Sequence, residues 1–84
     1  MKTYVDNVYT KDEGSPPITF AYFTIVARDD ADKFTYGGVE TRIQLSSVSE
    51  ANVRTVVDNA LATMFEAASP VQKLVYIIRE KLKM

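Results

Sequence analysis

The chain has 84 residues, a formal net charge of −1, 46% apolar residues, and neither histidine nor cysteine. This length fits one small domain, and the apolar and aromatic content indicates a packed fold rather than a disordered chain. The lack of histidine and cysteine excludes disulfides, the usual zinc and haem sites, thiol nucleophiles and the Ser–His–Asp triad.

No apolar stretch approaches the roughly 20 residues that cross a membrane. Lys2 and Asp6 precede no apolar segment, so we expect no signal peptide, and the lack of cysteine favours the cytoplasm as the location. The small net charge produces no global field that would attract nucleic acid or a membrane surface.

The first element is a predicted strand over Lys2–Thr10, whose alternation of apolar and polar residues is irregular. Simple alternation places Tyr4 and Val8 on one side and Val5 and Tyr9 on the other. The next seven residues contain one glycine and two prolines, so the sequence predicts a loop at positions 11–17.

Ile18–Arg28 has the strongest strand pattern of the chain. Apolar side chains occur on both of its faces, which is typical of a central strand or of a strand that meets a partner. One predicted face holds Ile18, Phe20, Tyr22, Thr24 and Val26, and the other holds Ala21, Phe23 and Ile25.

Asp29–Lys33 is the predicted hairpin loop after this strand. Its three aspartates, Asp29, Asp30 and Asp32, could bind a divalent cation loosely, but the spacing does not fit an EF-hand loop. The favoured interpretation is an acidic loop that stays in water.

Phe34–Leu45 is predicted to be the third strand, because apolar and polar residues alternate after the pair Gly37-Gly38. We interpret this pair as a bulge or bend, and a second tight turn is the alternative.

Residues 48–67 are predicted to form a helix, with a capping box between Ser47 and Glu50. Apolar residues recur at the helical spacing along one face of this segment. They are Val53, Val56, Val57, Ala60, Leu61, Met64, Phe65 and Ala68.

A second helix is predicted to begin after Ser69, with Pro70 in its first turn and Gln72 completing another capping box. Residues 73–78 are rich in strand-forming types, so a strand there is the alternative. The apolar stripe of the helical interpretation consists of Val71, Leu74, Val75, Ile78 and Leu82.

Together these elements predict a single α+β domain over 1–84, a small antiparallel meander of three strands followed by a helical hairpin (βββαα). Residues 1–46 form the sheet part and 47–84 the two-helix part. The two helices can cover only one face of the sheet, which leaves apolar and aromatic side chains on the other.

The leading functional hypothesis is a non-enzymatic protein-interaction module that associates with itself through its sheet as a homo-oligomer. No catalytic residues, metal site or cofactor is expected. A small chain without motifs also suits an accessory or inhibitor protein of a virus or mobile element. The predicted partner-binding residues are Phe20, Tyr22, Phe23, Ile25 and Tyr36.

The alternative is nucleic-acid binding by strand aromatics together with a basic C-terminal helix, and it is not favoured because few cations lie among those aromatics. Its candidate contacts are Lys73, Arg79, Lys81 and Lys83.

In the order of its elements, the tail after Leu45 resembles the end of single-stranded RNA phage coat proteins, which implies a coat-like dimer. Fewer residues precede Ser47 than that family's sheet needs. A sheet backed by two helices is also similar to some small phage inhibitors of CRISPR complexes, although no motif supports this.

Overall fold

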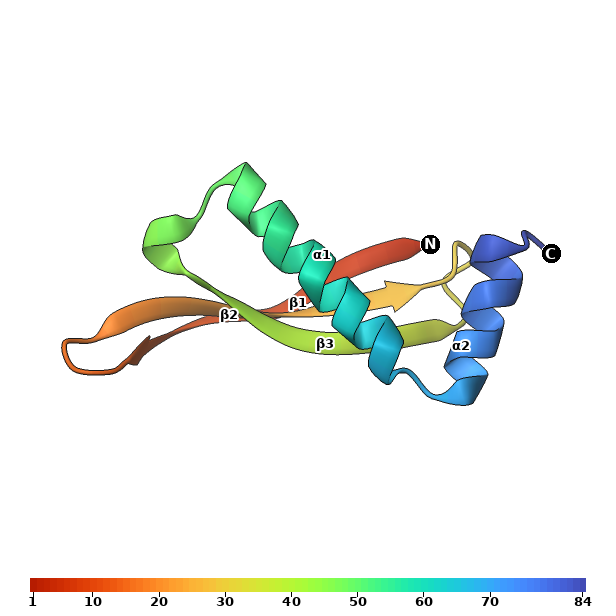
Figure 1. The fold of residues 1–84 in the computed structure, drawn as a ribbon, viewed down its shortest axis with the longest axis horizontal. Coiled ribbons are helices and arrows are strands. Elements are labelled where there is room, and N and C mark those ends of the chain that lie inside the picture. Colours follow the sequence, from red (N-terminus) through yellow and green to blue (C-terminus); the bar gives the residue numbers. More distant parts are fainter.

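The computed structural model describes residues 1–84 and confirms the α+β βββαα order (Figure 1). A short 3-10 turn joins the sheet to the helices, and a π-helical segment, Ile77–Lys81, continues the second helix. Residues 73–78 are therefore helical. The elements are β1 (Lys2–Glu13), β2 (Ile18–Arg28), β3 (Thr35–Gln44), α1 (Glu50–Ala67) and α2 (Pro70–Tyr76).

The three strands form one antiparallel sheet in the order β1-β2-β3. The hairpin of β1 and β2 reaches well beyond the helices, at the left of Figure 1. Strand β1 continues to Glu13, so the predicted loop is limited to the tight turn at 14–17. The sheet thus has one end covered by helices and one end that protrudes.

A bulge in β1 changes the predicted alternation of its side chains. Asp6 pairs with Thr24 and Tyr9 with Tyr22, so two residues of β1 oppose one residue of β2. Asn7 takes a left-handed conformation there, with φ 55°. Even-numbered residues before the bulge therefore lie on the same face of the sheet as odd-numbered residues after it. The simple alternation predicted for this strand is wrong beyond Asn7.

Helix α1 crosses the sheet diagonally over β3, and α2 stands at the end of the sheet (Figure 1). The covered face, which we call the helix face, forms two small core clusters. One contains Phe23, Ile25, Ile43 and Ala60, and the other contains Ala27, Tyr36 and Met64. The alternation predicted for β2 is confirmed, because its odd-numbered residues supply this core.

Gly37 and Gly38 do not form the predicted bulge or bend, since they pair regularly with Ala27 and Val26. The register instead shifts one residue earlier, at Tyr36. A Cβ atom on Gly37 would lie 2.8 Å from Cγ of Met64 in α1. Gly37 is thus explained by the close approach of the helix to the strand.

The start of α1 differs from the prediction. Ser49, rather than Ser47, is the N-cap, and its hydroxyl accepts a hydrogen bond from the backbone N–H of Asn52 at 3.1 Å. Ser47 lies in the preceding 3-10 turn. The second capping box is confirmed, with reciprocal hydrogen bonds between Ser69 and Gln72.

The molecule is elongated and buries little of itself. Its radius of gyration is 14.9 Å, whereas compact domains of this length have about 12 Å. Only nine residues are buried. The fold therefore leaves more of its surface in water than a typical small domain does.

Candidate interaction surfaces

The sheet face opposite the helices, the open face, is covered by a network of its own side chains. Tyr9 and Tyr22 stack with ring centroids 5.2 Å apart. The hydroxyl of Tyr22 donates to Glu13 at 2.6 Å, and Arg42 donates to the same carboxylate at 2.5 Å. The guanidinium of Arg42 also lies 4.1 Å from the ring centre of Phe20.

The charges of this network support one another. The hydrogen bond from Tyr22 and the nearby Arg42 lower the pKa of Glu13 below its usual value. The hydrogen bond that Arg42 donates to the hydroxyl of Tyr22 and the nearby carboxylate of Glu13 raise the pKa of Arg42. Partial burial and a hydrogen bond to Glu40 raise the pKa of Tyr9. The open face is therefore amphipathic and internally paired, in contrast to the apolar face that we expected.

The predicted partner-binding residues lie on both faces of the sheet and do not form one surface. Phe20 and Tyr22 lie on the open face within the network just described. Phe23, Ile25 and Tyr36 are buried beneath the helices, so their assignment to a partner surface is wrong for this fold. The alternation of β2 separates Phe23 and Ile25 from Phe20 and Tyr22.

Strand β1 forms the first uncovered surface. Its backbone contacts β2 along its length, and Tyr9 and Glu13 are hydrogen-bonded to Glu40 and Arg42 of β3. Val5 and Val8 are 59% and 67% exposed, and Tyr4 and Tyr9 are each 41% exposed. A long edge strand with free backbone groups and apolar side chains is a natural site for pairing with another chain.

The second uncovered surface is on the C-terminal helix. Val75 and Tyr76 pack against the core cluster around Tyr36. The rest of the predicted apolar stripe points mostly away from the sheet. Its exposed members are Val71, Leu74 and Leu82, with Ile77 beside them.

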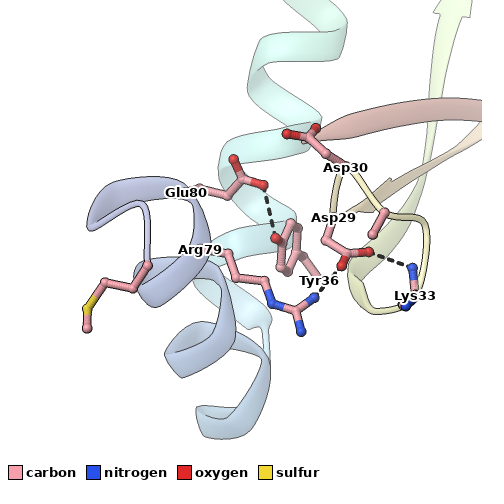
Figure 2. A pocket seen from close by; sticks show the side chains of 8 residues that line it. Asp29, Asp30, Lys33, Tyr36, Arg79 and Glu80 are labelled. Carbon is pink, nitrogen blue, oxygen red and sulfur yellow. Dashed lines mark hydrogen bonds and ion pairs between the residues drawn. The ribbon is translucent and has the colours of Figure 1, made fainter.

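An open hollow of about 380 Å³ lies where the β2–β3 loop meets the C-terminal helix (Figure 2). Asp29 accepts hydrogen bonds from the backbone of Lys33 and Phe34, at 2.6 and 2.9 Å, and forms an ion pair with Arg79. Asp29 is only 5% exposed. The expectation that this aspartate stays in water is therefore wrong.

The same hollow contains a hydrogen bond from the hydroxyl of Tyr36 to Glu80 at 2.9 Å. Burial and the adjacent carboxylate raise the pKa of Tyr36 to about 12. Backbone donors and Arg79 hold the pKa of Asp29 below its usual value. Both pKa values lie far from neutral pH, so neither group is suited to proton transfer there. The contacts instead hold the C-terminal helix against the loop.

The three loop aspartates do not converge on a common point, and no three acidic side chains are arranged to hold a metal ion. Asp30 is bonded to the amine of Met1 at 2.5 Å, and Asp32 forms an ion pair with Arg28 at 2.6 Å. Each aspartate therefore has a different cationic partner.

The candidate nucleic-acid contacts are also dispersed. Arg79 is paired with Asp29, Lys83 lies 3.9 Å from Glu80, and Lys81 lies over the ring of Tyr76 at 5.6 Å. Lys73 is exposed. The helix that holds these cations packs on the helix face, whereas Phe20 and Tyr22 lie on the other side of the sheet.

None of the helices is long and apolar enough to cross a membrane. Comparison of the chain with protein-family models, curated proteins and solved structures finds no match.

Proposed function

We propose that the chain is a non-enzymatic protein-interaction module that associates with a second copy through its sheet. The observation that carries this proposal is the amount of apolar side-chain surface left in water around a core of seven buried apolar residues. Exposed apolar surface of this extent commonly marks an interface. The exposed large side chains concentrate on β1 and on the C-terminal helix.

The excess surface has the size of an interface. The chain exposes 5680 Å², whereas a folded monomer of 9.4 kDa is expected to expose about 5,000 Å². The difference is roughly 600–700 Å² per chain. A standard protein interface removes about 800 Å² from each partner. One partner of similar size would therefore restore ordinary burial.

Nucleic-acid binding is less well supported, because Phe20 and Tyr22 lie on the face of the sheet opposite the cations of the C-terminal helix, whereas Phe23 and Tyr36 are buried beneath the helices. The aromatics of the open face are also engaged, with Tyr22 stacked on Tyr9 and Phe20 beneath Arg42. Roles as an accessory or inhibitor protein, and a cytoplasmic location, stay predictions.

The molar mass in solution tests the proposal. Light scattering across a range of protein concentrations is expected to give a dimer that dissociates on dilution. Because burial of apolar side chains is the main driving force of this association, high salt should weaken the dimer only modestly. A monomer at high micromolar concentration would contradict the proposal. A complex with an oligonucleotide that weakens steeply with salt would favour nucleic-acid binding instead.

A further inference from the structure

We infer that a second copy of the chain pairs antiparallel with β1 over the full length of the strand, so that Lys2 faces Glu13 of the second copy at each end. This inference rests on the proposed self-association and assigns its interface. Two copies joined in this way would form one six-stranded sheet, with β1 next to β1 in its centre.

Strand β1 has one unpaired edge and no helix packed along it. Strand β2 is paired on both sides, and β3 is covered by α1 and contacted by α2. All residues of β1 except Glu13 are exposed. A neighbouring strand would pair with the free backbone N–H and C=O groups of this edge. It would also shield Val5 and Val8 from water.

The bulge in β1 also favours this pairing. Residues opposite one another in an antiparallel pair lie on the same side of the sheet. Because of the bulge at Asn7, Lys2 and Glu13 share the open face although one number is even and the other odd. Full-length pairing therefore joins the two open faces into one surface, with the bulge at the two-fold axis.

Charge complementarity favours the same register. In this register Lys2 faces Glu13 and Tyr4 faces Lys11, and each pair occurs twice by symmetry. Glu13 uses only Oε2 in its bonds to Tyr22 and Arg42, which leaves Oε1 for the new partner. Shifting the register by two residues would bring Lys2 opposite Lys11, and like charges directly opposite are unfavourable.

Two competing arrangements must be distinguished. A register shorter by one residue would place Lys2 opposite Asp12 and put the helices of the two copies on opposite sides of the sheet. Pairing of β3 with β3 could place Glu40 opposite Arg42, with Thr41 at the two-fold axis. That edge is less suited, because β3 already packs against α1 and α2.

Engineered disulfides separate these arrangements, because the chain has no cysteine of its own. The test variant is Thr3→Cys/Asp12→Cys, whose two positions would face each other between copies. Opposite residues are about 4.5–5.5 Å apart at Cα, which suits a disulfide. Within one chain the two positions are roughly 30 Å apart along β1 and cannot join. The controls are Lys2→Cys/Asp12→Cys and Thr41→Cys.

We expect the test variant to become a covalent dimer under mild oxidation while both controls stay largely unlinked. Lys2→Glu should also weaken the wild-type dimer roughly tenfold, because two pairs become repulsive. Lys33→Glu, an equal charge change at an exposed loop residue, should leave it unchanged. A dimer that links only through a control variant would overturn pairing in this register and leave self-association standing. A monomeric wild-type chain would overturn both proposals.

Discussion

Arg79, near the C-terminal end of the chain, forms an ion pair with Asp29 in the loop that follows β2. Asp29 also accepts two backbone hydrogen bonds that close this loop. The carboxylate therefore ties three segments together: the loop, the end of the sheet and the C-terminal helix.

Asp29→Asn should destabilise the protein, because it removes the charge opposite Arg79 and leaves the amide near an unmatched guanidinium. We expect the melting temperature to fall by roughly 5–15 °C. Asp32→Asn is the matched control, since Asp32 forms an exposed pair with Arg28, and surface pairs contribute little. Equal melting temperatures for the two variants would show that Asp29 does not fasten the helix.

The same residue should give the protein an acid-sensitive stability. The pKa of Asp29 is lower in the folded protein than its ordinary value. The ionised Asp29 therefore contributes to the free energy of unfolding above about pH 4. This contribution is lost as the pH falls through the lower pKa of the folded state. Urea unfolding at a series of acidic pH values should show a weaker decline for Asp29→Asn than for the wild type.

Tyr36 should make the protein sensitive to alkaline pH. Its pKa is about 12 in the folded protein, against about 10 in an unfolded chain. Between these values the unfolded chain has released the proton and the folded protein has kept it, so rising pH favours unfolding. The protonated Tyr36 contributes its full share to the free energy of unfolding below pH 10. About 2–3 kcal/mol of that free energy is lost by pH 12. Urea unfolding of Tyr36→Phe should show a smaller decline between pH 9 and 12, and an identical decline would rule out this role.

Gly37 and Gly38 are neighbours with different constraints. Gly37→Ala would push a methyl group against Cγ of Met64 and should cost about 1–3 kcal/mol of unfolding free energy. Gly38→Ala would make only ordinary contacts, the nearest at 3.6 Å, and should be close to neutral.

Contact with Met64 as the cause is tested by measuring Gly37→Ala in a Met64→Ala variant. Once the methionine side chain is removed, Gly37→Ala should cost much less than in the wild type, because the obstructing atoms are gone. The measurement is a double-mutant cycle from urea unfolding curves. An equal cost in both backgrounds would show that the constraint on Gly37 is not contact with Met64.

The order of the elements could be predicted because it depends on local patterns. Alternation identified β2, and Ser69 with Gln72 identified the start of α2. The bulge at Asn7 could not be predicted, because neither glycine nor proline marks it. Burial of Asp29 depends on Arg79, fifty residues later. No local signal in either segment reports that contact.

The burial of Tyr36, a predicted partner-binding residue, could also not be predicted, because it depends on a helix that lies far away in the sequence. Tyr36 looks like an exposed strand aromatic in the sequence, and it is buried because α2 packs over it. The apolar stripe of the second helix was recognised correctly as a pattern, but a pattern cannot show which of its residues meets the sheet. In the structure Val75 packs on the core, whereas Leu74 lies in water.

This difference between adjacent residues gives the last prediction. Leu74 is 57% exposed, so Leu74→Ser should change the free energy of unfolding by no more than about 0.5 kcal/mol. Val75 packs against the core cluster around Tyr36, so Val75→Ser should cost about 1–2 kcal/mol through lost packing and a newly buried hydroxyl. Both values come from urea unfolding at a protein concentration low enough to keep the chain monomeric. If Leu74→Ser proved as costly as Val75→Ser under those conditions, the C-terminal helix would have to pack on its own sheet with a different face. The uncovered stripe would then not be available to a partner.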